Sequence, residues 1–262
     1  GVEVRPPCGL KSDWDCTLEY SGQGLKGVGL GLRQIKGLKR EEAETWVAVR
    51  VEGAWTLEGL VQMARPSRRF LELMAEADAF AGLGVNRRDA LWRVKGLATE
   101  ARVETEAPLL ALLGPPPEET VALPAMTLPA EVSEDYRTVS LSLKAHPCRF
   151  FRDRLEKLGA VTSEVLSQSR DGRRLSCGGL VLVRQRPGTA KGVVFMTLED
   201  ETGVSNVVVW PDVFRQHRRL VMGATFLVVH GRLQEAEGVR HLVAERFTDL
   251  SPLIAQMRNV GE

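Results

Sequence analysis

The sequence is poor in the residues that build metal sites, disulfide frameworks and membrane spans. It holds four cysteines and four histidines among its 262 residues. No two cysteines form a Cys-x-x-Cys pair and the histidines lack ligand spacing, so we predict neither a zinc site nor a disulfide framework. A membrane span needs about 18 consecutive apolar residues, and no such run is present. Scattered free thiols are typical of a reducing compartment, and we therefore expect a cytoplasmic protein without a membrane partner.

The N-terminal residues also lack a targeting signal. The segment GVEVRPPCGL has no basic stretch followed by an apolar one, as a secretory signal peptide would have. The first residue is Gly and not Met. We therefore expect the chain to be part of a longer protein.

The net charge of +1 is too small to predict a nucleic-acid-binding protein by itself, but the charge is unevenly distributed. Residues 101–135 carry one Arg against seven acids, a net charge of −6, so the remaining residues together carry +7. The acidic segment also contains APLLALLGPPP and LPAMTLP. We interpret it as an acidic, Pro-containing linker between two mildly basic modules, the alternative being an ordinary connection packed on the surface.

Residues 173–251 show the strongest pattern in the chain. Five β-branched runs are each closed by turn residues: Gly179–Val183, Gly192–Leu198, Val204–Trp210, Thr225–Leu233 and Val239–Phe247. A helical segment, Pro211–Leu220, separates the third run from the fourth. Three strands, a helix and two further strands are the order of the five-stranded OB-fold β-barrel, which binds oligonucleotides and oligosaccharides.

The second of these strands offers a candidate binding residue. Alternation along it predicts that Val194, Met196 and Leu198 face the core, which puts Phe195 on the outer face. Phe195 is therefore a candidate platform for stacking a base of a single strand, with Asn206 beside it on the next strand. The alternative is that Phe195 fills the barrel.

Cations lie in the loop between the first two strands. Arg184, Arg186 and Lys191 are candidate contacts to the phosphates of a bound strand, the alternative being solvated surface charges. Trp210 could share the outer face of Phe195, but we interpret it as packing in the core or at the rim.

Residues 30–100 contain two successive helix–turn–helix units. One turn holds Gly37, and the other, with Gly82 and Gly84, separates predicted helices at Phe70–Ala77 and Arg87–Val94. Glycine lets a backbone approach a phosphate, and a helix N-terminus supplies free N–H groups. The pattern predicts a tandem helix-hairpin-helix domain that grips the phosphate backbone, or alternatively a plain helical hairpin with solvated charges. The candidate contacts are Lys36, Gly37, Lys39 and Arg40 at the first turn, and Gly82, Gly84, Asn86 (also the helix cap), Arg87 and Arg88 at the second.

Four segments resemble the C-terminal region of bacterial C-family DNA polymerases of the DNA polymerase III alpha-subunit type, and most closely their error-prone, damage-inducible branch. They are LGLRQIKGL at 30–38, EADAFAGLGVNRRDALW at 76–92, EDYRTVSLSLKAHP at 134–147 and GLVLVRQRPGTAKGVVFMTLEDETGVSNVVVWPDVF at 179–214. The resemblance implies an α+β chain. Its parts are the irregular end of the fingers region (1–29), the tandem helix-hairpin-helix domain (30–100), the linker (101–135), a helical connector (136–172), the OB-fold domain (173–251) and a tail (252–262).

The resemblance also implies a function. In the family the helix-hairpin-helix domain holds primer–template duplex DNA and the OB-fold lies near the single-stranded template, so we expect a DNA-binding region of an error-prone DNA polymerase that acts in translesion synthesis and DNA repair. Accessory mutagenesis proteins are expected partners. Direct binding of the sliding clamp is not expected, since Thr105–Gly114 has no Gln and no aromatic residue.

The chemistry of the family needs parts that this chain lacks. We expect no cofactor in this chain, because Mg²⁺ would be held by the polymerase palm, and we expect no catalysis by the chain alone. Asp13 and Asp15 have the spacing of a metal pair, but they lie outside the family's catalytic motifs and we interpret them as non-catalytic.

Two other functions stay open from the sequence. One is a stand-alone DNA-binding protein built from the same two modules. The other is an anticodon-type RNA-binding module, because GVVFMTLEDETG resembles a strand in the OB-fold of aspartyl-type tRNA synthetases, where a Phe at the position of Phe195 stacks on a base.

Overall fold

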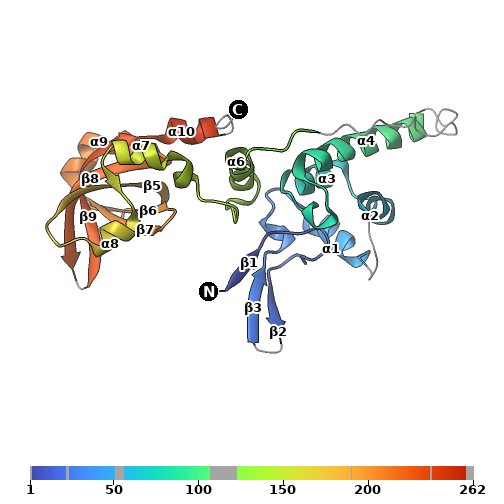
Figure 1. Cartoon of the computed structure of the whole chain (residues 1–262), viewed down its shortest axis with the longest axis horizontal. Helices are drawn as coiled ribbons and strands as arrows, with labels where there is room; N and C mark the ends of the chain where they lie inside the picture. Colours follow the sequence, from blue (N-terminus) through green and yellow to red (C-terminus); the bar gives the residue numbers. More distant parts are fainter. Residues whose placement is uncertain are drawn as a thin grey trace. The chain divides into compact units, whose positions relative to one another are not determined.

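The computed structural model describes residues 2–21, 24–50, 56–106, 123–189, 191–236 and 238–257. The chain divides into two compact units (Figure 1). The first, called the helical unit below, is Gly1–Met126 with Glu134–Leu143, and the second, called the barrel unit, is Thr127–Ser133 with Lys144–Glu262. Among the described residues, no helix has the length and apolar character needed to cross a membrane.

The helical unit is built around Trp46. Its helices are α1 (Arg40–Ala48), α2 (Leu57–Ala64), α3 (Arg68–Glu76) and α4 (Arg87–Glu106), with short 3-10 helices η1 (Leu32–Gln34) and η2 (Ala81–Leu83). Helices α2 and α3 are capped by Thr56 and Ser67, whose hydroxyls accept a backbone N–H of the first turn. The Trp46 ring is fully buried and lies 5.6 Å from Phe70 and 5.9 Å from Phe80, measured between ring centroids.

Both predicted helix–turn–helix units are present in the helical unit. Gly37 follows η1 with φ of +80° and precedes α1, while Gly84 follows η2 with φ of +73° and precedes α4. These positive φ values favour glycine, which is why the turns could be found from the sequence. Helix α4 extends to Glu106, twelve residues past its predicted end at Val94.

Residues 1–29, expected to be irregular, contain a small sheet. Strands β1 (Glu3–Arg5), β2 (Thr17–Ser21) and β3 (Gly24–Gly29) have the order β1-β3-β2. The segment between β1 and β2 packs on the helices, because the Gly9 N–H donates to the Ala79 carbonyl at 2.7 Å and Trp46 Nε1 donates to the Gly9 carbonyl at 2.8 Å. The expectation is therefore corrected, since these residues are part of the helical unit.

The expected linker, residues 101–135, is also corrected where the structure describes it. Its first residues belong to α4, and α6 (Leu128–Val139) occupies its end and the start of the expected connector. The stretch 107–122 lies outside the described residues. The rest of the connector holds η3 (Pro147–Phe151), α7 (Arg152–Lys157), the short strand β4 (Ala160–Val161) and α8 (Ser163–Gln168).

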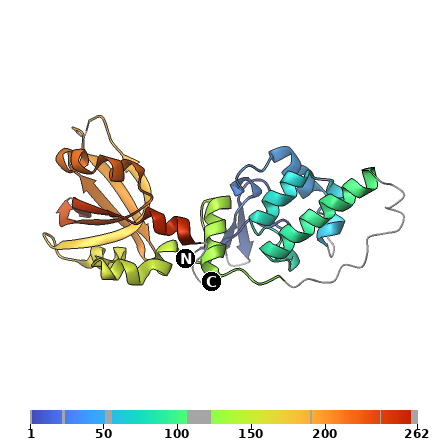
Figure 2. The same ribbon diagram turned by 90° about the horizontal axis from the view of Figure 1, so that it is seen from above.

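The five predicted strands of the barrel unit are confirmed and form a closed barrel. They are β5 (Arg174–Gln185), β6 (Val194–Asp200), β7 (Gly203–Val209), β8 (Phe226–Ala236) and β9 (Val239–Asp249), with α9 (Pro211–Gly223) between β7 and β8. The order is β4-β5-β6-β7-β9-β8, and an additional β5–β8 pairing closes the barrel. The observed order of strands and helix is thus the order predicted for an OB-fold. Figure 2 shows α9 on one side of the barrel strands and α7 and α8 on the opposite side.

The barrel core follows the predicted alternation. Val194, Met196 and Leu198 are each 1 % exposed and pack with Val207 and Val209. The main difference lies in β5, which is twelve residues long because its first half pairs with β8 and its second half with β6. The predicted tail begins with a short helix, α10 (Ser251–Gln256).

Candidate nucleic-acid interface

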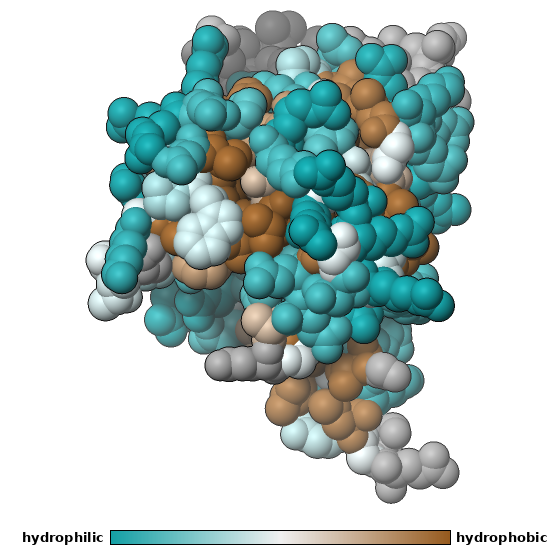
Figure 3. Space-filling view, turned by 90° about the vertical axis from the view of Figure 1, so that its left-hand side faces the viewer, coloured by the Kyte–Doolittle hydropathy of each residue, from teal (hydrophilic) through white to brown (hydrophobic). Residues whose placement is uncertain are grey.

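The outer face of β6 and β7 carries two exposed aromatic side chains. Phe195 is 38 % exposed and Trp210, which directly follows β7, is 51 % exposed. Phe195 lies opposite Val208, so the exposed ring has an apolar neighbour across the strand pair. Figure 3 shows that hydrophobic side chains reach the surface of the barrel unit in patches between hydrophilic ones. The predicted outward orientation of Phe195 is confirmed. Trp210, interpreted as packing in the core or at the rim, does not lie in the core, because half of its side chain is exposed.

Polar groups lie beside this aromatic surface. Asn206 is partly buried on the same outer face, opposite Thr197 on β6 and His241 on β9. Amide, hydroxyl and imidazole groups can donate to and accept from the edge of a base. Phe195 and Trp210 with Asn206 therefore form a surface that offers both stacking and hydrogen bonding to an unpaired base.

Two of the three cations predicted for the first loop are directed towards α9. Arg184 Nε donates to the Val221 carbonyl at 2.7 Å and its Nη2 donates to the Ala224 carbonyl, so it caps the C-terminal end of α9. Burial lowers the pKa of the Arg184 guanidinium. The Arg186 guanidinium lies 5.0 Å from the centroid of the Phe214 ring. Lys191 is exposed and has no ion pair among the described residues.

The prediction that Arg184 contacts a phosphate is therefore corrected. Its guanidinium caps α9, because the carbonyls at the end of a helix bind a positive charge. We expect Arg184→Ala to lower the free energy of unfolding by about 1.5–3 kcal/mol, the contribution of hydrogen bonds to a charged group. Lys191→Ala should leave stability unchanged and reduce the salt dependence of single-strand binding by about 0.7 in the log–log slope. Urea denaturation and binding titrations at several salt concentrations measure both, and the reverse pattern would contradict this assignment.

In the first hairpin of the helical unit, only some of the predicted phosphate contacts remain accessible. Lys39 is exposed at the N-terminus of α1 and provides no side-chain cap, and Arg40 is exposed and pairs with Glu44 at 2.7 Å. Lys36 is engaged within the fold, because its ammonium donates to the Tyr136 and Arg137 carbonyls at 3.0 Å each. Lys36 thus binds the end of α6, while Gly37, Lys39 and Arg40 leave an accessible helix N-terminus.

The second hairpin is more enclosed than the sequence indicated. A Cβ added to Gly82 would lie 2.7 Å from the Cys8 sulfur, so close packing within the unit already explains this glycine. Gly84 has open space around its Cα. Asn86 Oδ1 accepts the Asp89 N–H at 3.0 Å, which confirms the predicted cap of α4 and uses one of its free N–H groups.

The two arginines after this hairpin both make contacts inside the helical unit. Arg87 is 2 % exposed and forms an ion pair with Asp135 of α6. Arg88 Nη1 donates to the Pro124 carbonyl at 2.9 Å and the side chain is exposed. The prediction that Arg87 contacts DNA is corrected, since a buried guanidinium paired with a carboxylate cannot reach a phosphate.

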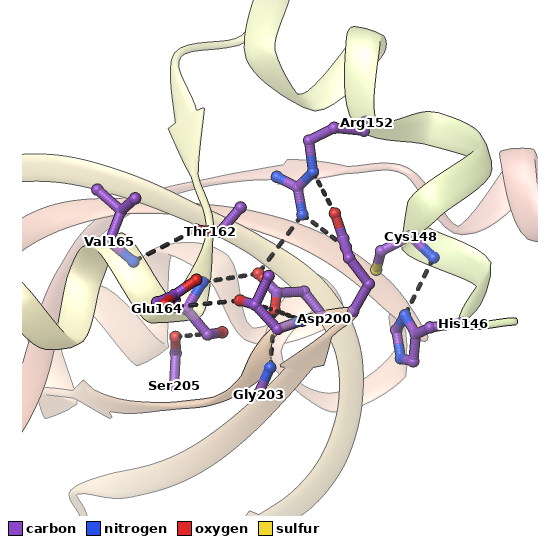
Figure 4. A network of polar contacts seen from close by, with 12 residues as sticks. His146, Cys148, Arg152, Thr162, Glu164, Val165, Asp200, Gly203 and Ser205 are labelled. Carbon is purple, nitrogen blue, oxygen red and sulfur yellow. Dashed lines mark hydrogen bonds and ion pairs between the residues drawn. The ribbon is translucent and has the colours of Figure 1, made fainter.

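The run Glu199-Asp200-Glu201 predicts a solvated acidic hairpin from the sequence alone, but in the structure this turn after β6 fastens the connector to the barrel. Asp200 is 4 % exposed and accepts the N–H groups of Ser163 at 2.7 Å, Thr202 at 2.8 Å and Gly203 at 3.1 Å (Figure 4). Arg152 Nε donates to Glu201 at 2.6 Å. The acids therefore anchor the connector helices and are not a solvated loop.

One group in this network has the composition of a metal site. Within the described residues, three possible ligand atoms lie within 4.8 Å of one another, one each from His146, Cys148 and Glu201. His146 Nδ1 accepts the Cys148 N–H at 3.2 Å, which leaves the ring proton on Nε2, and burial lowers the His146 pKa. Burial also raises the pKa of the Cys148 thiol. Because metal ligands must be deprotonated and Glu201 is bound by Arg152, this group does not fit a metal centre.

The other candidate metal pair is separated by its own ion pairs. The Asp13 carboxylate lies 3.0 Å from Arg50 and the Asp15 carboxylate lies 2.5 Å from Arg33. Two carboxylates that each compensate a different arginine do not converge on one ion.

Sequence reasoning considered an outward position for Trp210 without favouring it, and it missed Asp135. For Trp210 the signal was present, because alternation along β7 already put it on the face of Asn206. For Asp135 there was no local signal, since its partner Arg87 is 48 residues away in the chain.

Comparison with known proteins matches both units. Residues 1–90 match the family described as a helix-hairpin-helix motif, and residues 176–250 match the OB-fold nucleic acid binding domain. Proteins named error-prone DNA polymerase align with nearly the whole chain. One from Caulobacter vibrioides is 53 % identical over 99 % of this chain, one from Ruegeria pomeroyi is 46 % identical over 98 %, and one from Sinorhizobium medicae is 42 % identical over 98 %. The chain covers 26 %, 23 % and 25 % of these relatives, about a quarter of each.

Proposed function

Because this chain belongs with the error-prone DNA polymerases, of which it spans about a quarter, we propose that it is the part of such an enzyme that holds DNA. The helical unit binds the backbone of primer–template duplex at the first hairpin, and the barrel unit binds the single-stranded template on the outer face of β6 and β7. The observation that carries the proposal is the exposed Phe195–Trp210 surface on a barrel of the nucleic-acid-binding type.

The division of work between the two units follows from their surfaces. The N-terminus of α1 carries Lys39 and Arg40 together with the acids Glu41 and Glu42 in its first turn. Its attraction for phosphates therefore comes from Lys39, Arg40 and the free N–H groups, and it carries no base specificity. Exposed rings bind unpaired bases, whose faces are inaccessible in a duplex. A protein with both surfaces can hold the junction where a duplex continues into a single strand.

The wider setting of the proposal is the complete polymerase. Nucleotide addition, and with it Mg²⁺, belongs to parts of the enzyme outside this chain, which contributes affinity and not catalysis. We propose that the complete protein acts in the cytoplasm in translesion synthesis during DNA repair, and that accessory mutagenesis proteins recruit it.

A second candidate function is RNA binding by the barrel unit. Phe195 lies on an outer strand face, as a base-stacking residue of an anticodon-binding module would. Glu199 disfavours this function. The tRNA synthetase strand that GVVFMTLEDETG resembles has an arginine at this position, whereas the Glu199 carboxylate repels a phosphate.

We expect the 262-residue chain to bind single-stranded DNA and primer–template junctions with an affinity that falls as salt rises, since each phosphate contact releases counterions. Fluorescence anisotropy with a labelled single strand and with a labelled junction measures both. Unlabelled tRNA should compete much less well than unlabelled single-stranded DNA of the same nucleotide concentration. Preferential competition by tRNA would favour the anticodon-type function, and absence of any DNA binding would remove the proposal.

A further inference from the structure

A stretch of like charge lies on the barrel surface away from β6 and β7. Arg174 on β5 and Arg232 on β8 are exposed and lie directly opposite each other in the strand register. Like charges in directly opposite positions destabilise a strand pair. Within the described residues, the Glu245 carboxylate lies 3.2 Å from Arg174 and compensates one of the two charges, so a bound anion would reduce the remaining repulsion.

The arginine pair extends into the turn that precedes β5. Arg232 Nε donates to the Gly172 carbonyl at 3.0 Å, which holds its guanidinium against this turn. Arg170 and Arg173 of the same turn line an open hollow of about 680 Å³. Four arginines therefore gather at one end of β5 and β8. The hollow beside them is also lined by Asp171, whose carboxylate accepts the Glu235 N–H at 2.9 Å, so the arginines outnumber the acid there.

The strand register connects the arginine pair to the aromatic surface. Phe195 on β6 lies opposite Val208 on β7, and Val208 lies opposite Val243 on β9. Val243 in turn lies opposite Arg232, which lies opposite Arg174. These five residues form one transverse row across neighbouring strands of the barrel.

The residues of this row face outward. Phe195, Arg232 and Arg174 are exposed, and Val208 and Val243 are partly exposed, whereas their sequence neighbours Val207 and Leu242 are 1 % and 0 % exposed. A second row, Thr197, Asn206, His241 and Gln234, runs beside it through the same strands and carries polar groups. Four strand spacings of about 4.8 Å give the first row a length of about 19 Å along the surface.

We propose that single-stranded DNA follows these two rows around the barrel, so that a base stacks on Phe195 and phosphates further along the strand bind Arg232 and Arg174. This inference rests on the proposed function and adds a phosphate site that the aromatic surface alone does not contain. The apolar middle of the first row accepts bases or sugars, the polar row reads base edges, and the arginine pair replaces its mutual repulsion with contacts to the DNA backbone.

The test compares strands of increasing length, over roughly the 4–16 nucleotides of known OB-fold site sizes, on the full 262-residue chain. For the wild type, affinity should rise with length until the strand reaches the arginine pair. In Arg174→Ala/Arg232→Ala, long strands should bind no more tightly than short ones, and the log–log salt slope should fall by about 0.7 for each lost phosphate contact. Glu245→Gln should bind long strands more tightly than the wild type, because it removes the competing carboxylate.

The matched control is Arg218→Ala/Arg219→Ala, which removes the same charge from exposed positions on α9. It should keep the length dependence of the wild type. Arg174→Ala alone tests the same site if loss of Arg232 disturbs the turn. This variant should keep the fold, since the Arg174 side chain is 78 % exposed and its ion pair is a surface pair. The inference would be overturned if both double variants lost the same affinity for long strands, or if Arg174→Ala/Arg232→Ala lost none. In either case, binding of short strands that still depends on Phe195 would support the proposed function.

Discussion

Replacing Arg87 with alanine is expected to lower the free energy of unfolding of the helical unit by about 3–5 kcal/mol, the cost of leaving a buried carboxylate without its partner. Arg87 is 2 % exposed, the Asp135 side chain is 11 % exposed, and Ser142 Oγ also donates to Asp135 at 2.7 Å. Because α4 and α6 meet at this ion pair, we expect the loss to appear as unfolding of these helices. Urea denaturation gives the free energy, and hydrogen exchange of the α4 amides locates the change.

Two variants separate the ion pair from other effects of residue 87. Arg87→Met/Asp135→Leu should recover most of the lost stability, because a buried pair can often be exchanged for apolar residues at little cost. Arg88→Ala, at the neighbouring exposed position, should change stability by less than about 0.5 kcal/mol. If Arg87→Ala instead weakened DNA binding while the unfolding free energy stayed unchanged, the guanidinium would be a phosphate contact after all.

Phe195→Ala should weaken the binding of single-stranded DNA by about 1–3 kcal/mol, or roughly 5- to 150-fold, the contribution of one stacked base. The ring is 38 % exposed and lies on the outer face of β6, so its removal should leave the barrel core intact. Anisotropy titrations give the affinity, and circular dichroism with thermal unfolding reports the fold. Phe195→Trp should keep most of the affinity, because the larger ring also stacks.

Two controls test whether the effect is stacking. Phe195→Leu keeps an apolar side chain and removes the ring, so it should behave like the alanine variant. Tyr20→Ala removes a 68 % exposed aromatic side chain from the helical unit and should leave single-strand affinity unchanged. An unaltered affinity of Phe195→Ala in a folded protein would take Phe195 out of the interface and leave Trp210 as the remaining exposed aromatic side chain described near it.

Local patterns were sufficient for the barrel and for the hairpins. Alternation over residues 194–198 correctly predicted that Phe195 faces outward and Met196 faces the core, since successive side chains on a strand point to opposite faces. Glycines at 37 and 84 marked turns because their φ values of +80° and +73° suit that residue type. The cap at Asn86 followed from a side chain that reaches only three residues along the chain.

Local patterns failed where a charge found its partner far along the chain. Arg184 looked like a loop cation, yet it binds carbonyls at the end of α9, 37 and 40 residues away. Lys36 likewise binds the end of α6, 100 and 101 residues away. The small sheet at residues 3–29 was missed because its strands are short and its segment is held by contacts to the helices.

The sequence by itself determined the five strands of the barrel and their order, the two hairpins of the helical unit, and which side chains of β6 face the core, because these depend on spacings of a few residues. Only the tertiary structure decided which cations stay free to meet a phosphate and which are neutralised inside the fold. It also aligned Phe195, Val243 and Arg174 in one row across the barrel. The reason is physical: a guanidinium binds the nearest carbonyl or carboxylate in space, and closure of the chain sets that distance.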